Sequence, residues 1–119
     1  MEEFAVVPSM RLLWSAGDAA KRDNTCIYNC AFAKIDCIEA FAECLHILMC
    51  GTGFGFSVRQ EDVAKLPVVP KIQSAKGATH IVEDSREGWA DSVKILMERL
   101  NSGKNIKFDY SSVRPQGPK

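Results

Sequence analysis

The chain has 119 residues, of which 15 are basic, 15 are acidic and 46% are hydrophobic. This length suits one domain, and the composition is that of an ordinary soluble globular protein. The formal charge of zero gives no support to a nucleic-acid or membrane-surface partner. The longest apolar stretches are too short to span a bilayer, and the N-terminus lacks the features of a signal peptide.

Five cysteines are present, and they fall within 25 positions of one another: Cys26, Cys30, Cys37, Cys44 and Cys50. An odd number of cysteines without a signal peptide argues against a secreted disulfide framework. Reduced thiols are the usual state in the cytoplasm, so we expect a cytoplasmic protein.

The first predicted elements are a short helix and a strand. The helix is capped by Ser9 and runs to residue 16, and a turn follows at residues 23–24. Residues 25–33 favour a strand because they are rich in β-branched and aromatic side chains. On such a strand Cys26 and Cys30 would share one face, about 13 Å apart, which is too far for a disulfide.

A long amphipathic helix is predicted next. Asp36 looks like its N-cap with Glu39 as capping-box partner, and Gly51 ends it. A glycine loop at residues 51–55 and a short strand at 56–58 follow. The second half is predicted to contain helical turns at 60–66, a mobile loop at 71–79, a long helix capped by Ser85 and stopped by Gly103, a strand at 106–110 and a flexible tail at 111–119. This alternation of helices and strands indicates one α/β domain with crossover helices.

The residues alone do not name a reaction. The cysteine spacings do not match the close pairs of a zinc ribbon, so no metal site is predicted. The loop at 51–55 follows a helix instead of preceding one, which favours a helix stop and tight turn over a phosphate cradle. Its glycines still imply that backbone or ligand approaches closely. The acidic run at 83–87 fits a helix start, and His46 and His80 are isolated in the sequence.

Five segments together resemble the monomeric type of adenosylcobalamin-dependent ribonucleoside-triphosphate reductase, and the similarity runs from about residue 8 to residue 119. In chain order they are Pro8-Ser9-Met10-Arg11 with Leu13-Trp14 and Ala16-Gly17; Tyr28-Asn29-Cys30-Ala31-Phe32; Leu48-Met49-Cys50-Gly51-Thr52-Gly53 through Gly55-Phe56-Ser57-Val58; Val82-Glu83-Asp84-Ser85 with Glu87-Gly88-Trp89-Ala90; and Ser112-Val113-Arg114-Pro115 with Gly117.

The resemblance implies a fold and a chemistry. The family folds as a ten-stranded α/β barrel with a central finger loop, so this chain would form the N-terminal portion of that barrel. The family reduces the ribose 2′-hydroxyl of ribonucleoside triphosphates by thiyl-radical chemistry that the adenosylcobalamin cofactor initiates. The cofactor would be bound by parts of the family enzyme that this chain does not contain.

The resemblance also implies roles for individual residues. Cys30 matches the first of two reducing cysteines, which forms a disulfide with a partner after each turnover. Ser9 matches a position near the substrate phosphates at a helix N-terminus, and Asn29 lies where it would contact the ribose. The remaining assignments are backbone approach to the substrate by Gly51, Thr52, Gly53 and Gly55, and the start of the loop that relays effector identity at Arg114, Pro115 and Gly117.

Several of the family's parts have no counterpart here. The radical cysteine, the second reducing cysteine and the cobalamin-binding region are absent, and Cys26, Cys37 and Cys44 are interpreted as packing residues. We therefore expect a single partial-barrel domain over residues 1–119, inactive alone, that joins the remainder of a split reductase. The alternatives are a non-catalytic barrel remnant, which binds nucleotide or forms homo-oligomers through exposed sheet edges, and a zinc-binding module.

Overall fold

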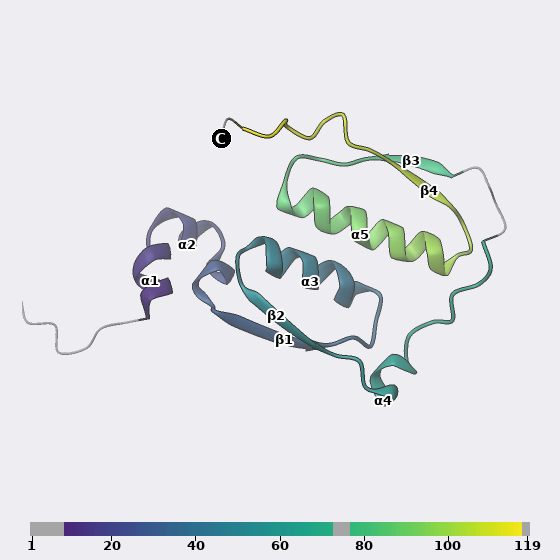
Figure 1. Ribbon diagram of the computed structural model, residues 1–119, viewed down its shortest axis with the longest axis horizontal. Helices are drawn as coiled ribbons and strands as arrows, with labels where there is room; N and C mark the ends of the chain where they lie inside the picture. The colour runs from purple at the N-terminus through teal and green to yellow at the C-terminus, as the bar shows by residue number, and fades with distance from the viewer. Residues whose placement is uncertain (1–8, 73–76, 118–119) are drawn as a thin grey trace, which may run out of the picture.

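The computed structural model describes residues 9–72 and 77–117, and it is built from helices and short parallel strands (Figure 1). Two β-α-β units make up most of the described chain. The elements are α1 Met10–Ser15, α2 Asp18–Arg22, the 3-10 helix η1 Asn24–Ile27, β1 Cys30–Lys34, α3 Glu39–Met49, β2 Gly53–Ser57, α4 Gln60–Val63, β3 Ala78–Ile81, α5 Arg86–Asn101 and β4 Ile106–Asp109.

The first unit is β1-α3-β2. Its strands pair in parallel with Cys30 opposite Gly53 and Phe32 opposite Gly55. A parallel pair needs a crossover connection, and α3 supplies it. Because side chains alternate along a strand, the residues between these positions face α3 and leave Cys30, Phe32 and Lys34 on the outer face, where all three are exposed.

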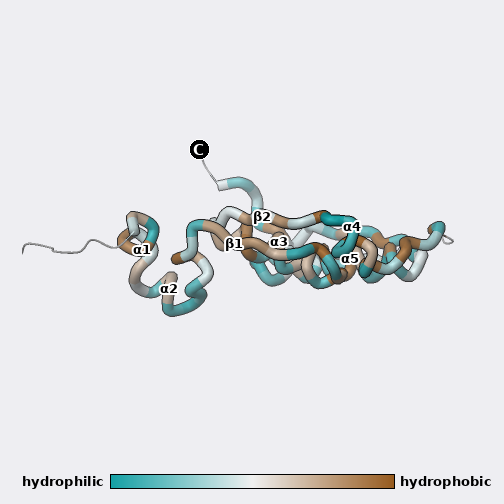
Figure 2. The backbone as a smooth tube through the Cα atoms, turned by 90° about the horizontal axis from the view of Figure 1, so that it is seen from below, coloured by the Kyte–Doolittle hydropathy of each residue, from teal (hydrophilic) through white to brown (hydrophobic). Residues whose placement is uncertain are grey.

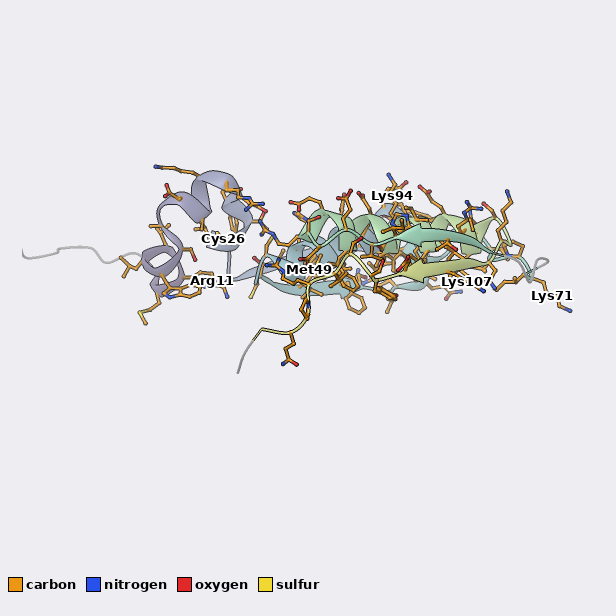
Figure 3. All side chains as sticks on the ribbon, turned by 90° about the horizontal axis from the view of Figure 1, so that it is seen from above. Arg11, Cys26, Met49, Lys71, Lys94 and Lys107 are labelled. Carbon is orange, nitrogen blue, oxygen red and sulfur yellow. The ribbon has the colours of Figure 1, made fainter. Side chains whose placement is uncertain are left out.

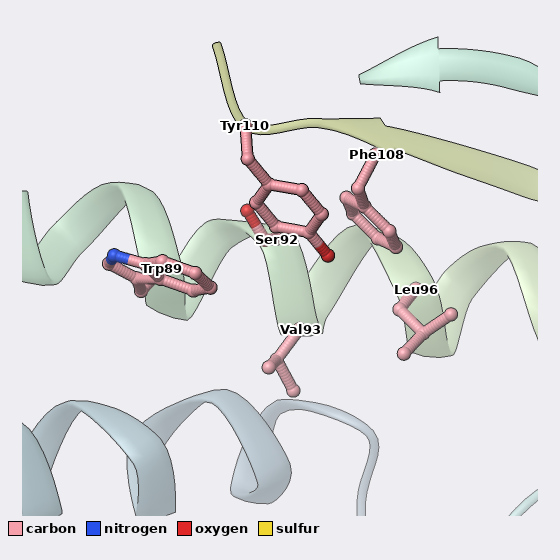
Figure 4. A pocket seen from close by; sticks show the side chains of 6 residues that line it. All are labelled: Trp89, Ser92, Val93, Leu96, Phe108 and Tyr110. Atoms are coloured by element: carbon pink, nitrogen blue, oxygen red, sulfur yellow. The ribbon is translucent and has the colours of Figure 1, made fainter. Parts of the chain in front are cut away.

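The second unit, β3-α5-β4, has the same order and the same parallel pairing, with His80 opposite Phe108. Aromatic side chains from β4, from the residue after it and from α5 lie between this sheet and α5 (Figure 4). Tyr110 stacks on Trp89 with ring centroids 5.8 Å apart, and Phe108 lies 6.3 Å from Tyr110. Together with residues of α5 these rings surround a cavity of about 120 Å³ (Figure 4).

The helices α3 and α5 pack against each other, so the two sheets lie on opposite sides of the helix pair (Figure 1). Seen edge-on, the two sheets and the helix pair between them form one thin, flat layer (Figure 2). The buried apolar residues of the described chain are few: Ile35, Ala40, Cys50 and Val82. Large apolar side chains such as Trp14, Phe32 and Val68 are 88%, 69% and 90% exposed. Among the described helices, none is long and apolar enough to cross a membrane.

Several helix boundaries match the sequence prediction. Ser9 caps α1 by accepting a hydrogen bond from the Leu12 N–H, and Ser85 caps α5 by accepting one from the Gly88 N–H. Gly51 and Gly103 follow α3 and α5 with φ of +83° and +64°. This left-handed conformation favours glycine after a helix end.

The strand predicted at 25–33 is wrong in its first half. The Asp23 side chain accepts a hydrogen bond from the Thr25 N–H and caps η1, so the chain is helical over Asn24–Ile27. A local side-chain bond of this kind competes with strand pairing. Cys26 therefore lies in η1 and Cys30 begins β1, and the two do not share a strand face.

Three other boundaries also differ from the prediction. Asp36 does not cap α3, which begins at Glu39 without a side-chain cap; the Asp36 carboxylate instead lies 3.9 Å from the Lys65 Nζ. The strand predicted at 56–58 is β2 and begins earlier, at Gly53. The loop predicted at 71–79 gives way to β3 from Ala78, and its residues 73–76 lie outside the described chain.

The fold class is mixed α/β, as predicted, but the described residues form two separate two-stranded sheets and do not close a barrel. In the predicted tail, residues 111–117 are described and residues 118–119 are not. The tail starts in a turn, in which the Val113 N–H donates to the Tyr110 carbonyl at 3.0 Å and the Ser111 N–H donates to the Asp109 carboxylate at 2.9 Å.

Candidate functional site

Cys30 is the first residue of β1, and its thiol lies on the outer face of the first sheet. The residue is exposed, unlike Cys50, which is 8% exposed. On the neighbouring strand the directly opposite position is Gly53, and the next position on the same face is Gly55. The thiol thus projects beside a strip of bare backbone, which we call the glycine floor (Gly53 and Gly55).

The side chains nearest the glycine floor are the Cys30 thiol beside Gly53 and the Phe32 ring beside Gly55. A Cβ added to Gly53 would lie 3.4 Å from the Asn29 carbonyl oxygen and 3.9 Å from the Cys30 Sγ. A Cβ added to Gly55 would lie 3.4 Å from the Phe32 ring. Both positions could therefore accept a methyl group with little or no rearrangement. Folding does not demand glycine at either position, and its effect there is to leave space next to the thiol.

The residues on either side of the floor hold its geometry. The Asn29 carbonyl accepts a hydrogen bond from the Gly53 N–H at 2.9 Å, and the Asn29 residue is exposed. The Thr52 side chain is 2% exposed, and its hydroxyl shares one hydrogen between the carbonyls of Thr25 and Tyr28, at 2.8 and 3.0 Å. Its hydroxyl is already used inside the fold, so any contact of Thr52 with a ligand would come from its backbone.

Helix α1 is attached to this end of the first unit through Arg11. The Arg11 Nη1 donates to the Gly51 carbonyl at 2.8 Å and to the Cys26 carbonyl at 3.4 Å. Figure 3 shows Arg11 and Cys26 at the same end of the molecule. Ser9 caps this helix, but α1 has only six residues and the Ser9 hydroxyl already accepts from the Leu12 N–H. The structure thus brings Asn29 and Cys30 beside residues 51–55, and it gives Ser9 contacts within α1.

The residues predicted to start the effector loop lie elsewhere. Arg114 follows β4, and its Nε lies 2.7 Å from the Asp84 carboxylate, on the loop that precedes α5. Pro115 and Gly117 are exposed. In Figure 1 the stretch after β4 runs along the side of α5 that faces away from β1 and β2.

The other cysteines are unpaired thiols in different surroundings. Cys44 is half-buried beside a cavity of about 310 Å³, and burial raises the pKa of its thiol. Cys26 is half-buried, and its Sγ donates to the Asp23 carbonyl at 3.2 Å. Both fit the predicted packing role. Cys37 does not, because it is exposed on the loop before α3.

A second cluster was missed in the sequence. The Cys50 Sγ lies 3.2 Å from the Asp23 Oδ2 and 3.8 Å from the His46 Nε2, and those two atoms are 3.7 Å apart. The Arg86 Nη1 donates to the Cys50 Sγ at 3.0 Å and lies 3.6 Å from the Asp23 Oδ2. The sequence contained one local signal of this cluster: His46 and Cys50 are four residues apart and so share a helix face.

Electrostatics in this cluster separate a charged carboxylate from a neutral thiol. Hydrogen bonds from Thr25 and from the Cys50 thiol hold the pKa of the Asp23 carboxyl well below its usual value. Burial, and then the neighbouring Asp23, raise the pKa of the Cys50 thiol. Cys50 is therefore protonated at neutral pH, and a buried protonated thiol is a poor nucleophile.

The described chain does not form a corrinoid pocket. The best-formed cavities among the described residues measure between about 120 and 500 Å³, and Cys30 is not among their lining residues. Pockets of about 300–1,000 Å³ hold drug-sized ligands, and a cobalamin is larger than a drug-sized ligand. The residues present thus do not fit adenosylcobalamin by themselves.

The described site is thus an exposed thiol beside a glycine floor in an α/β fold, and two curated relatives of the chain are named as reductases. The chain is 28% identical over 126 residues to an adenosylcobalamin-dependent ribonucleoside-triphosphate reductase of Euglena gracilis. It is 30% identical over 137 residues to a probable enzyme of the same name from Dictyostelium discoideum. These matches cover 98% and 97% of this chain.

The chain spans only 17% and 18% of the length of these two relatives. No family model matches the chain, and no solved structure matches it. The comparisons thus support a relation at the level of the family.

Proposed function

We propose that the chain is a segment of the catalytic barrel of an adenosylcobalamin-dependent ribonucleoside-triphosphate reductase, with Cys30 as one of its two reducing thiols. The observation that carries this proposal is the exposure of the Cys30 thiol beside the glycine floor. A sulfur that reduces a bound ribose needs access to it, and bare backbone lets a ligand come close.

The chemistry assigned to Cys30 requires a second thiol. Replacing the ribose 2′-hydroxyl by hydrogen consumes two electrons and two protons and releases water. Two thiols supply these as they join in a disulfide, which a dithiol then reduces by exchange. None of the other four cysteines lies on the strand face of Cys30: Cys26 is in η1, Cys37 precedes α3, Cys44 is in α3 and Cys50 is its C-cap. The partner thiol therefore comes from another part of the enzyme, in the same polypeptide or in a second one.

The other site assignments belong to the same proposal. Asn29 contacts the ribose, the backbone of Gly51, Thr52, Gly53 and Gly55 forms the floor under the substrate, and Ser9 lies toward its phosphates. The contact of Asn29 with Gly53 and the pairing of Cys30 with Gly53 support a shared role for these positions, and the Arg11–Gly51 bond attaches the helix that Ser9 caps. Arg114, Pro115 and Gly117 begin the loop that reports effector identity, and the Arg114–Asp84 ion pair gives this loop an anchor at its start.

The decisive experiment replaces Cys30 in the enzyme reconstituted from this chain and the remaining parts of the reductase. Cys30→Ser is expected to reduce turnover with an external dithiol to background, because the serine hydroxyl cannot form the disulfide. Cys37→Ser is the matched control, since Cys37 is also exposed but lies outside the floor, and it should leave turnover unchanged. Normal turnover of the Cys30→Ser enzyme would refute the assignment.

A second measurement addresses the need for further parts. The chain alone, given a ribonucleoside triphosphate, adenosylcobalamin and a dithiol, is expected to form no deoxyribonucleotide. Turnover by the isolated chain would contradict the idea that it depends on other segments.

The exposed apolar surface favours one other candidate, a non-catalytic remnant that binds nucleotide or associates through its sheets. Phe32, Phe56 and Ile81 are 69%, 57% and 56% exposed on or beside strands of two-stranded sheets. Such strands present unpaired backbone groups and invite edge pairing. Size-exclusion chromatography should then show concentration-dependent oligomers, and a clean monomer at all concentrations would count against this candidate.

A further inference from the structure

A site that the reductase proposal does not use lies where η1, α3 and α5 meet. Asp23 precedes η1, His46 lies on the last turn of α3, and Cys50 is its C-cap. One ligand atom from each of these residues falls within 4.8 Å of the other two. Carboxylate, imidazole and thiolate are the three ligand types that zinc takes in proteins.

The spacing of the three atoms is that of neighbouring corners of a zinc tetrahedron. With metal–ligand bonds of about 2.0–2.3 Å, tetrahedral ligands lie about 3.4–3.6 Å from one another. The observed separations are 3.2 Å for Cys50 Sγ to Asp23 Oδ2, 3.7 Å for Asp23 Oδ2 to His46 Nε2, and 3.8 Å for Cys50 Sγ to His46 Nε2. Each differs from the ideal range by only a few tenths of an ångström.

The positive charge of Arg86 opposes the binding of a cation at these three ligands. Its Nη1 lies 3.0 Å from the Cys50 Sγ and 3.6 Å from the Asp23 Oδ2, so a positive charge already faces two of the ligands. Arg86 is the first residue of α5, and its side chain is 30% exposed, so the side chain can turn outward. Asp23 and His46 are 21% and 32% exposed, which leaves a route for an ion to enter.

We propose that Asp23, His46 and Cys50 form a binding site for a borderline-soft divalent cation such as Zn²⁺, which Arg86 closes when no metal is bound. Metal entry breaks the Cys50 S–H bond and forms an S–metal bond, and the proton leaves to solvent. Without metal, the Asp23 carboxylate is balanced by the Arg86 guanidinium beside a neutral thiol. With metal, two anionic ligands balance the divalent ion and the guanidinium is released. The ligand cluster itself carries no net charge once the ion is bound, and the Arg86 guanidinium takes its positive charge out to solvent.

The position of the site gives it a structural consequence. Asp23 begins the segment that leads to Cys30, and Cys50 directly precedes the turn that leads to the glycine floor. A bound ion would therefore tie together the two chain segments that flank the floor. Because folded ligands bind metal and unfolded ones bind it less, metal should also raise the unfolding temperature.

Titration of the reduced chain with Co²⁺ tests the site, because a cobalt–thiolate bond gives a charge-transfer absorption and a tetrahedral field gives strong visible bands. We expect one Co²⁺ per chain with both signatures, displaced by Zn²⁺. Cys50→Ser should abolish the charge-transfer band. His46→Ala should weaken binding by at least about 100-fold, since even partners outside the ligand shell contribute about 10–100-fold. Cys37→Ser is the matched control and should bind as the unaltered chain does.

Arg86→Gln provides a test that does not depend on variants that lose a ligand. It removes the opposing charge while keeping a polar side chain at the start of α5, so Co²⁺ should bind about tenfold more tightly. Absence of a thiolate band, a band that survives Cys50→Ser, or unchanged affinity in Arg86→Gln would each overturn the proposal. None of these results bears on the role of Cys30, which the turnover assay measures separately.

Discussion

The two β-α-β units share one architecture, but their sheets differ in the side chains that they carry. In the second unit, Phe108 and Tyr110 line a small cavity between sheet and helix, and Tyr110 stacks on Trp89 (Figure 4). In the first unit, Gly53 and Gly55 leave the outer face of the sheet bare beside an exposed thiol. The same backbone arrangement therefore carries an aromatic cluster on the helix-facing side of the second sheet and an exposed thiol on the outer side of the first.

Their glycines make the contrast clear. Gly88, in the first turn of α5, is required by packing, because a Cβ there would lie 2.6 Å from the Glu83 Cβ and 2.7 Å from its carbonyl oxygen. Gly53 has no contact of that kind, since its nearest neighbour would be 3.4 Å away. Packing does not require glycine at position 53, and the neighbouring Cys30 thiol is exposed. We therefore interpret Gly53 as a functional residue.

The largest expected effect is that of Gly88→Ala. The added methyl group overlaps Glu83 and forces the start of α5 away from the preceding loop, which should lower the free energy of unfolding by about 1–3 kcal/mol. Urea unfolding followed by circular dichroism measures it. Gly53→Ala is the matched control and should change stability by less than about 1 kcal/mol, in line with the modest cost of glycine in a strand. Equal losses in the two variants would remove the contrast between the glycines.

Thr52→Val should give the next largest effect. The substitution keeps the shape but removes the hydroxyl that bonds the Thr25 and Tyr28 carbonyls, and this should cost about 1–2 kcal/mol of unfolding free energy. Thr79→Val is the control, because Thr79 is exposed on β3 and valine is as compatible with a strand. If Thr52→Val is as stable as the unaltered chain, the hydroxyl does not hold the floor in place.

The smallest effect should appear in thiol reactivity. Cys30 is exposed and Cys50 is buried, so an alkylating reagent should modify Cys30 first. Gly53→Ala should slow the alkylation of Cys30 by about two- to fivefold, because access to the attacking sulfur limits its rate. Mass spectrometry of digested protein reports both rates, with Cys37 as an internal reference whose rate should not change. An unaltered rate at Cys30 would mean that the floor does not control access to the thiol.

Local sequence signals predicted the helices well and the strands less well. Ser9, Ser85, Gly51 and Gly103 mark helix ends through local capping and turn chemistry, and the structure confirms them. The start of β2 at Gly53 was missed because glycine disfavours strands, and here pairing with β1 overrides that preference.

The candidate site shows the same limit. The grouping of residues near Cys30 followed from a resemblance to a known family, and their separations in the sequence would not have indicated it. The cluster of Asp23, His46 and Cys50 was missed because Asp23 is 27 residues from Cys50, and only the folded chain brings the two side chains to 3.2 Å. Long-range proximity of this kind has no periodic pattern in the sequence.

The contact of Arg11 with the Gly51 and Cys26 carbonyls, described above, couples three pieces of chain mechanically. One planar side chain spans the carbonyl after α3, the carbonyl within η1 and the helix that carries it. A tilt of α1 must then lengthen these hydrogen bonds or displace the two segments that they hold. One segment leads from η1 to Cys30, and the other leads from Gly51 to the glycine floor. Movements of α1 would in this way be passed on to the turn that leads into the glycine floor.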